Sequence, residues 1–93
     1  MILEDLFKVI EDRQDNPTEN SYTAKLISMG EDEIIKKIGE EAMEVIIASK
    51  SQGNQRLIEE ISDLYYHTLV LLAYKNLSPT HIQEELEKRH KPK

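Results

Sequence analysis

The sequence has no cysteine and no tryptophan, and it has only three glycines, three prolines and one phenylalanine in 93 residues. Without cysteine there is no disulfide framework, no thiolate metal site and no cysteine nucleophile. No apolar run approaches the roughly 20 residues that a membrane-spanning helix needs. The N-terminus carries acids where a signal peptide would need basic residues, so the sequence predicts a cytoplasmic protein.

Positive charge is also scarce, because 12 basic residues stand against 18 acidic ones and give a formal net charge of −6. Nucleic acids and anionic membranes bind basic surfaces, so neither is expected as a partner. A nucleotide remains compatible with this charge, since its phosphates bind together with metal. Apolar residues make up 39% of the chain and charged residues 32%, which is the balance of a globular protein.

The length allows one domain, predicted to cover residues 1–93. A domain of this size buries about two-thirds of the surface of its unfolded chain, so its single core is small. Helical chains of this size often gain further burial by dimerising. We therefore expect a homodimer.

Apolar residues recur at three- and four-residue steps along most of the chain, a pattern typical of amphipathic helices. No segment has the alternation of a strand. The predicted fold class is all-α, a small bundle of four to five helices. The helices are expected to begin near residues 2, 21, 32, 55 and 79. The first ends at a breaker cluster at 14–17, the second is closed by Gly30 in the left-handed conformation, and the third ends by Gly53.

Two short acidic segments lie on the third and fourth predicted helices, which are otherwise apolar. They are 40–44, with the sequence EEAME, and 60–63, with the sequence EISD. At 3.6 residues per turn, Glu41 and Glu44 share one face of their helix. By the same spacing, Glu60 and Asp63 share a face, and both pairs point toward the apolar side.

The linker between these helices, at about 50–54, is short, so they should be antiparallel neighbours that bring the two acidic segments together. Carboxylates that point toward a core are costly to desolvate, and a hard divalent cation compensates them. The sequence therefore predicts a Mg²⁺ site between two helices. The competing interpretation is a solvated acidic surface, which is the usual fate of acid pairs at this spacing.

Two neighbouring residues have alternative roles. Lys37 is either an ion-pair partner of Glu41 or a contact for a phosphate oxygen. His67 lies one turn after Asp63, and a lone histidine there is more often a partly buried, hydrogen-bonded side chain than a ligand.

Magnesium would neutralise charge on a leaving pyrophosphate and lower the pKa of a bound water. Glu40 or one of the four carboxylates could accept the proton of that water.

The chain resembles the phosphoribosyl-ATP pyrophosphatase family, small enzymes of histidine biosynthesis within the MazG-like, all-α nucleotide pyrophosphohydrolases. The superfamily signature is E-E-x-x-E followed by E-x-x-D, and it is met by Glu40, Glu41, Glu44, Glu60 and Asp63. The segments 13–30, 37–42, 63–67 and 84–90 narrow the resemblance to the family. It covers essentially the whole chain.

The resemblance implies Mg²⁺-dependent hydrolysis of phosphoribosyl-ATP at its α–β phosphoanhydride, giving phosphoribosyl-AMP and pyrophosphate. It also implies a MazG-like helical homodimer with sites near the subunit interface. The implied metal ligands are Glu41, Glu44, Glu60 and Asp63. The implied catalytic residues are Glu40, Glu41 and Glu44, with Glu40 helping to activate water. The implied substrate contacts are Lys37, Lys25, Arg13, Ser21, Tyr22 and Thr23; Ser21 and Thr23 are equally suited to capping a helix.

Two alternatives stay open. One is a MazG-like enzyme that removes surplus nucleoside triphosphates, using the same carboxylates on a different base and sugar. The segment 21–23 favours the histidine-pathway substrate over this alternative. The other is a non-catalytic helical dimerisation module with solvated acids, which would show no dependence on magnesium.

Overall fold

The computed structural model describes residues 2–90, which form five helices and no strand. The helices are α1 (Ile2–Asp15), α2 (Tyr22–Met29), α3 (Glu31–Ser51), α4 (Gly53–Tyr74) and α5 (Pro79–Arg89). The all-α prediction is confirmed, and each helix begins within about two residues of the expected position. None of the described helices is long and apolar enough to span a bilayer. The predicted domain also includes residues 1 and 91–93, which lie outside the described part.

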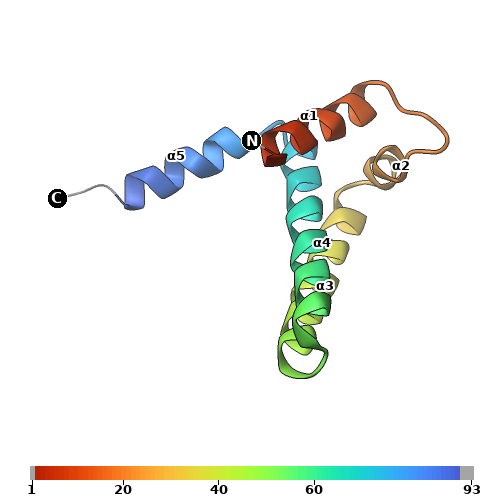
Figure 1. Ribbon diagram of the computed structural model, residues 1–93. Helices are drawn as coiled ribbons and strands as arrows, with labels where there is room; N and C mark the ends of the chain where they lie inside the picture. Colours follow the sequence, from red (N-terminus) through yellow and green to blue (C-terminus); the bar gives the residue numbers. More distant parts are fainter. Residues whose placement is uncertain (1, 91–93) are drawn as a thin grey trace.

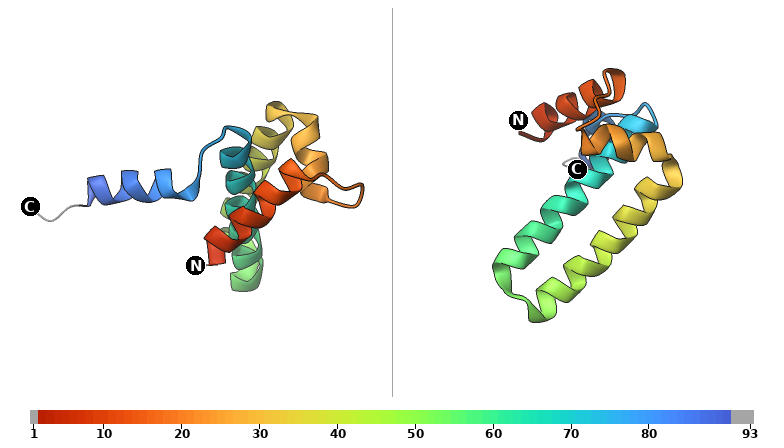
Figure 2. Two further views of the ribbon diagram at one scale, coloured as in Figure 1. Left: turned by 90° about the horizontal axis from the view of Figure 1, so that it is seen from above. Right: turned by 90° about the vertical axis from the view of Figure 1, so that its right-hand side faces the viewer.

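Helices α3 and α4 form an antiparallel hairpin, as the short linker predicts (Figure 2). Their 21 and 22 residues give each a length of roughly 30 Å at about 1.5 Å per residue. Only Gln52 separates them, and Gly53 opens α4 with a φ of 85°. A positive φ suits glycine, because it has no Cβ to clash. The reversal is therefore tighter than the sequence indicates.

Helices α1 and α2 cross the end of the hairpin opposite its turn, where α3 begins and α4 ends (Figure 1). The core lies at this covered end. Its buried apolar residues are Phe7, Ile10, Leu26, Ile34, Leu69, Val70 and Ala73. All four helices contribute to it, because each turns one apolar face inward.

The junction between α2 and α3 fixes where α2 lies. Ser21 caps α2, and its Oγ accepts a hydrogen bond of 3.0 Å from the backbone N–H of Ala24. Gly30 has a φ of 97° and a ψ of 177°. The positive φ agrees with the predicted helix end, but this ψ is extended and not that of the left-handed helical conformation. Such a backbone is almost restricted to glycine, and it turns the chain directly into α3.

Helix α5 leaves the body of the molecule and projects away from it (Figure 1). Asn76, with a φ of 60°, ends α4 in a Schellman-type turn in which the N–H of Leu77 donates to the carbonyl of Leu72 at 2.8 Å. Ser78 and His81 then form a capping box at the start of α5. None of the side chains from Pro79 to Arg89 is buried. The predicted helix is confirmed, and its thin apolar face finds no cover within the described chain.

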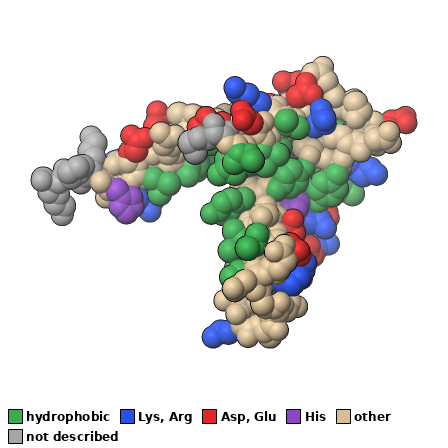
Figure 3. Space-filling view, in the orientation of Figure 1, with side chains coloured by type: hydrophobic (Ala, Val, Ile, Leu, Met, Phe, Trp, Pro, Cys, Tyr) green, Lys and Arg blue, Asp and Glu red, His purple; other side chains and the backbone are tan. Residues whose placement is uncertain are grey.

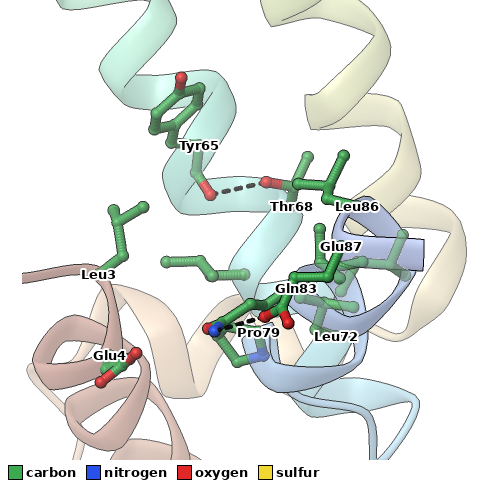
Figure 4. Close-up of a pocket in the computed structure, with 12 residues that line it drawn as sticks. Leu3, Glu4, Tyr65, Thr68, Leu72, Pro79, Gln83, Leu86 and Glu87 are labelled. Atoms are coloured by element: carbon green, nitrogen blue, oxygen red, sulfur yellow. Dashed lines mark hydrogen bonds between the residues drawn. The ribbon is translucent and has the colours of Figure 1, made fainter. Parts of the chain in front are cut away.

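An apolar groove of about 720 Å³ lies between α1, α4 and α5 (Figure 4). Its apolar lining includes Leu3, Tyr65, Leu72, Ile82 and Leu86. In Figure 3 apolar side chains fill the angle between α5 and the hairpin, while acidic, basic and histidine side chains gather along the opposite edge of the hairpin. The polar site is thus separate from the apolar groove.

Candidate metal and substrate site

The hairpin brings the two acidic segments into electrostatic range of each other. Glu41 and Glu44 come from α3, and Glu60 and Asp63 come from α4. The charges of Glu44 and Asp63 both raise the pKa of Glu60, and the charge of Asp63 raises that of Glu41. Within residues 2–90, however, no three His, Cys, Asp or Glu side chains lie close enough to hold one metal ion. The four carboxylates form a cluster without a finished coordination sphere.

Glu60 is the most deeply placed of the four, with 5% of its surface exposed. Burial raises the pKa of its carboxyl above the usual value, and the neighbouring charges of Glu44 and Asp63 add to this rise. The guanidinium of Arg56 opposes it, since Nη2 lies 2.9 Å from Oε1 of Glu60. The half-exposed Arg56 therefore supplies part of the positive charge that this carboxylate needs.

Glu41 has a side chain that is 15% exposed. Burial raises its pKa, the contact with His67 lowers it, and the charge of Asp63 raises it again. Oε1 of Glu41 touches Nδ1 of His67 and has no other partner within the described residues. A buried carboxylate oxygen in this condition is suited to a cation, because cation binding would satisfy it. The donor set therefore fits a hard metal such as Mg²⁺.

Lys37 and Glu40 lie on α3 beside this cluster. Nζ of Lys37 is 3.9 Å from Oε1 of Glu40, so Lys37 forms an ion pair with Glu40 and not with Glu41. The charge of Lys37 still lowers the pKa of Glu41, which places the ammonium group near the cluster. The side chain of Glu40 is half exposed. Both residues are therefore open to solvent at the edge of the site.

Two hydrogen bonds join the start of α2 to side chains of α4 next to the acidic cluster. The hydroxyl of Tyr22 lies 3.0 Å from Nε2 of His67, and Oγ1 of the buried Thr23 is hydrogen-bonded to the hydroxyl of Tyr66. Capping is confirmed for Ser21. It is wrong for Thr23, whose hydroxyl reaches across to α4.

The two remaining substrate candidates lie farther out. Nη1 of Arg13 pairs with Asp12 at 2.9 Å in the last turns of α1. Lys25 is exposed on α2. In the described chain no hydrogen bond or ion pair joins either residue to the acidic cluster. Their proposed role would therefore depend on a substrate that extends from the cluster toward α1 and α2.

Two residues of the site are not among the sequence-based candidates. His67 is buried, as its alternative interpretation predicts, but it also connects Glu41 with Tyr22. Arg56 pairs with Glu60. The signal for Arg56 is its i, i+4 spacing to Glu60, which places both on one face of α4. No local spacing indicates the contact of His67 with Tyr22, which lies 45 residues away.

Fold and site together define a class: all-α proteins in which a helical hairpin gathers carboxylates from both of its helices. The sequence resembles the all-α nucleotide pyrophosphohydrolases, and the described fold is all-α. A family model described as phosphoribosyl-ATP pyrophosphohydrolase matches residues 3–90. The chain belongs to the phosphoribosyl-ATP pyrophosphohydrolase family.

Individual relatives are similar over nearly the whole chain. A phosphoribosyl-ATP pyrophosphatase of Clostridium acetobutylicum is 56% identical over 89 residues, which are 96% of this chain and 81% of the relative. One of Pelotomaculum thermopropionicum is 50% identical over 92 residues, 99% of this chain and 94% of the relative. One of Listeria welshimeri is 53% identical over 88 residues, 95% and 84% of the two chains.

Proposed function

We propose that this chain is a phosphoribosyl-ATP pyrophosphatase of histidine biosynthesis, with a cytoplasmic location that follows from the biosynthetic reaction. It hydrolyses phosphoribosyl-ATP at the α–β phosphoanhydride and releases phosphoribosyl-AMP and pyrophosphate. The observation that carries this proposal is the family match over residues 3–90, together with relatives of that name at 50–56% identity. Because the family consists of enzymes, a non-catalytic dimerisation module has no support.

The proposed metal is Mg²⁺, and its proposed ligands are Glu41, Glu44, Glu60 and Asp63. Three observations support this assignment: the burial of Glu60, the buried oxygen of Glu41 whose one partner among the described residues is His67, and the charges of Glu44 and Asp63, which raise the pKa of Glu60 or Glu41. Repulsion among the carboxylates opposes their closer approach without a cation. Mg²⁺, when bound, supplies a Lewis acid for the phosphates and lowers the pKa of a bound water.

The proposed roles of the chain's own residues follow their positions. Glu40, at the solvent edge, accepts the proton of the attacking water, and Lys37 beside it contacts a phosphate oxygen. Tyr22 and Thr23 present the start of α2 to the substrate next to the acidic cluster. Ser21 is the helix cap that holds this segment, and it lies close enough in sequence to contact substrate as well.

The outer candidates, Lys25 and Arg13, extend the proposed substrate path away from the metal ligands. Phosphoribosyl-ATP carries a second ribose phosphate, so it needs cationic contacts beyond the triphosphate. Lys25 is exposed and available for such a contact. Arg13 would have to exchange its partner Asp12 for a phosphate group.

We also propose that the active protein is a homodimer. The support is apolar surface that one chain leaves open: the groove between α1, α4 and α5, and apolar residues that are about half exposed. They include Tyr65, Ile82 and Leu86, which line the groove. A second copy would remove this surface from water.

A pyrophosphate-release assay tests the proposed reaction. We expect turnover of purified phosphoribosyl-ATP that requires added Mg²⁺ and stops in excess EDTA. Turnover of dCTP and dUTP should be far slower under the same conditions. If the deoxynucleotides are consumed and phosphoribosyl-ATP is not, the assigned substrate is wrong, and the chain uses the same carboxylates on a different nucleotide.

A further inference from the structure

The ring of His67 lies where three helices meet. It belongs to α4 and is 6% exposed. Nε2 lies 3.0 Å from the hydroxyl of Tyr22 on α2, and Nδ1 touches Oε1 of Glu41 on α3. The rings of Tyr22 and Tyr66 stand nearly perpendicular to it, with centroids at 5.9 Å and 5.1 Å. The imidazole is therefore held from several sides.

The neighbours of the ring determine where its hydrogen lies. Nδ1 is 3.0 Å from the backbone carbonyl oxygen of Asp63 and also touches the carboxylate of Glu41. Both neighbours are acceptors, so Nδ1 must carry a hydrogen and donate it. Nε2 shares a hydrogen bond with the hydroxyl of Tyr22. These hydrogen bonds link Tyr22 through His67 to the carboxylate of Glu41 and the backbone carbonyl of Asp63.

Both nitrogens of His67 have partners in the protein, so the structure does not place this ring as a metal ligand. Burial raises the pKa of Tyr22, and nearby negative charges raise it further, so its hydroxyl stays protonated. In metal sites, residues that do not bind the metal often form hydrogen bonds to the ligating side chains and orient them, and His67 has the position of such a residue relative to Glu41. Such residues fix the direction of a ligand without touching the metal.

We propose that His67 is a positioning residue that holds Glu41 in its ligating orientation and is itself held by Tyr22. The inference rests on the proposed function, since it concerns the same metal site. It adds a physical link between the substrate-binding start of α2 and the metal ligands. By linkage, anything that fixes Tyr22 should then favour metal binding, and metal should favour the same position of Tyr22.

The test measures Mg²⁺ binding by calorimetry on the substrate-free protein. Tyr22→Phe removes one hydroxyl that lies far from the carboxylates in sequence and on another helix. We expect roughly three- to tenfold weaker Mg²⁺ binding, the effect of one lost hydrogen bond. Tyr74→Phe, elsewhere on α4, is the matched control and should bind Mg²⁺ as the unmodified chain does. If Tyr22 only contacts substrate, Tyr22→Phe will bind Mg²⁺ normally and the inference is overturned.

Two replacements of His67 separate its two nitrogens. The amide nitrogen of asparagine can take the place of Nδ1, and the amide group of glutamine can reach the place of Nε2. His67→Gln should weaken Mg²⁺ binding by about 10- to 100-fold, the usual effect of losing an outer partner. His67→Asn, which keeps a donor toward Glu41, should recover most of that loss. Equal Mg²⁺ affinity in both variants and in the unmodified chain would leave His67 only a structural role.

The outcome is separable from that of the proposed function. If the unmodified chain releases no pyrophosphate from phosphoribosyl-ATP, the proposed function fails whatever the variants do. If it does release pyrophosphate and Tyr22→Phe leaves Mg²⁺ binding unchanged, only the positioning role fails. Should a His67 variant not fold, Tyr22→Phe alone decides, because its hydroxyl can be removed without opening the core.

Discussion

The two ends of the helical hairpin differ sharply. At the end that α1 and α2 cover, Ile34 and Val70 are fully buried. Toward the turn between α3 and α4, Ile46 and Ile58 are 57% and 58% exposed. The amino-acid types are the same, but only one end has elements to pack against. Within the described residues, the buried cluster of larger apolar side chains therefore lies at the covered end, and toward the turn the one buried apolar residue is Ala48.

The acidic cluster lies between these two regions. Glu41 and Asp63 sit next to the covered end, where His67 and Tyr22 reach them. Glu44 and Glu60 lie one turn closer to the open end, where Arg56 is the neighbouring cation. Glu41 and Asp63, which are half of the site, are therefore in contact with packed neighbours. The other half depends on one half-exposed arginine.

The largest expected effect is the loss of turnover when a carboxylate of the acidic cluster is neutralised. Glu44→Gln and Asp63→Asn each remove one proposed ligand, so we expect pyrophosphate release to fall by about 1,000-fold or more. The fold should survive, because both side chains are exposed. The measurement is initial rate at saturating Mg²⁺, with melting temperature as the check on folding. Glu85→Gln, whose carboxylate pairs with Arg89 on α5, is the control and should keep full turnover. Normal rates in either ligand variant would contradict the metal assignment.

The next largest effect is on stability, and it tests the contrast directly. Ile34→Ala should lower the free energy of unfolding by about 2–5 kcal/mol, because it leaves a cavity in the covered core. Ile46→Ala should change it by no more than about 0.5 kcal/mol in a single chain. Urea unfolding at several protein concentrations measures both. A large loss for Ile46→Ala that grows with protein concentration would show that a second chain covers the open end too.

The fold was largely predictable, and its exceptions have local causes. Helix starts followed from caps and breakers, such as Ser21 and the Ser78–Pro79 pair, which act within one turn. The direction of α5 was not predictable. The direction of α5 depends on the backbone of Asn76, which ends α4 with a positive φ. The spacing of Ile82 and Leu86 indicates which face of α5 is apolar, but it does not indicate where the helix points.

The site was predictable in part for a similar reason. The i, i+3 spacing of the acids and the short linker are local, so the sequence indicates that Glu41 and Glu60 lie on facing helices. The contacts of Tyr22 with His67 and of Thr23 with Tyr66 join residues 45 and 43 positions apart, and no spacing along one helix can reveal them. The four ligand assignments stay predictions, and the turnover measurements test them.

Association is the third test of the contrast. Leu86→Asp places a charge in the apolar groove, and we expect it to raise the dissociation constant of the dimer by about tenfold or more. Light scattering after size-exclusion chromatography, over a range of concentrations, measures this change. Thr80→Asp adds the same charge to α5 outside the groove lining and should leave association unchanged. If the unmodified chain is a monomer at all concentrations, the proposed dimer is wrong.

The smallest effect compares two adjacent glutamates at the open side of the site. Burial raises the pKa of Glu60, so the folded chain binds that proton more tightly than the unfolded chain does. Its favourable effect on stability is present below about pH 4.5 and is lost as pH rises through the raised pKa. Glu59 has the opposite shift, since hydrogen bonds from Gln55 and Arg56 lower its pKa. Its stabilisation is present above the usual value and is lost as pH falls through the lowered pKa.

Replacing each glutamate by glutamine should therefore shift stability in opposite directions at neutral pH. In EDTA, Glu60→Gln should raise the melting temperature by a few degrees or less, and Glu59→Gln should lower it slightly. Added Mg²⁺ should reverse the order for Glu60→Gln, because the unmodified chain gains stability by binding metal and the variant has lost a ligand. Melting curves at pH 4 to 8 with EDTA or Mg²⁺ measure both differences. If Glu60→Gln melts lower than the unmodified chain in EDTA at pH 7, the pair with Arg56 outweighs the burial of Glu60, and the carboxylate has no need of a metal.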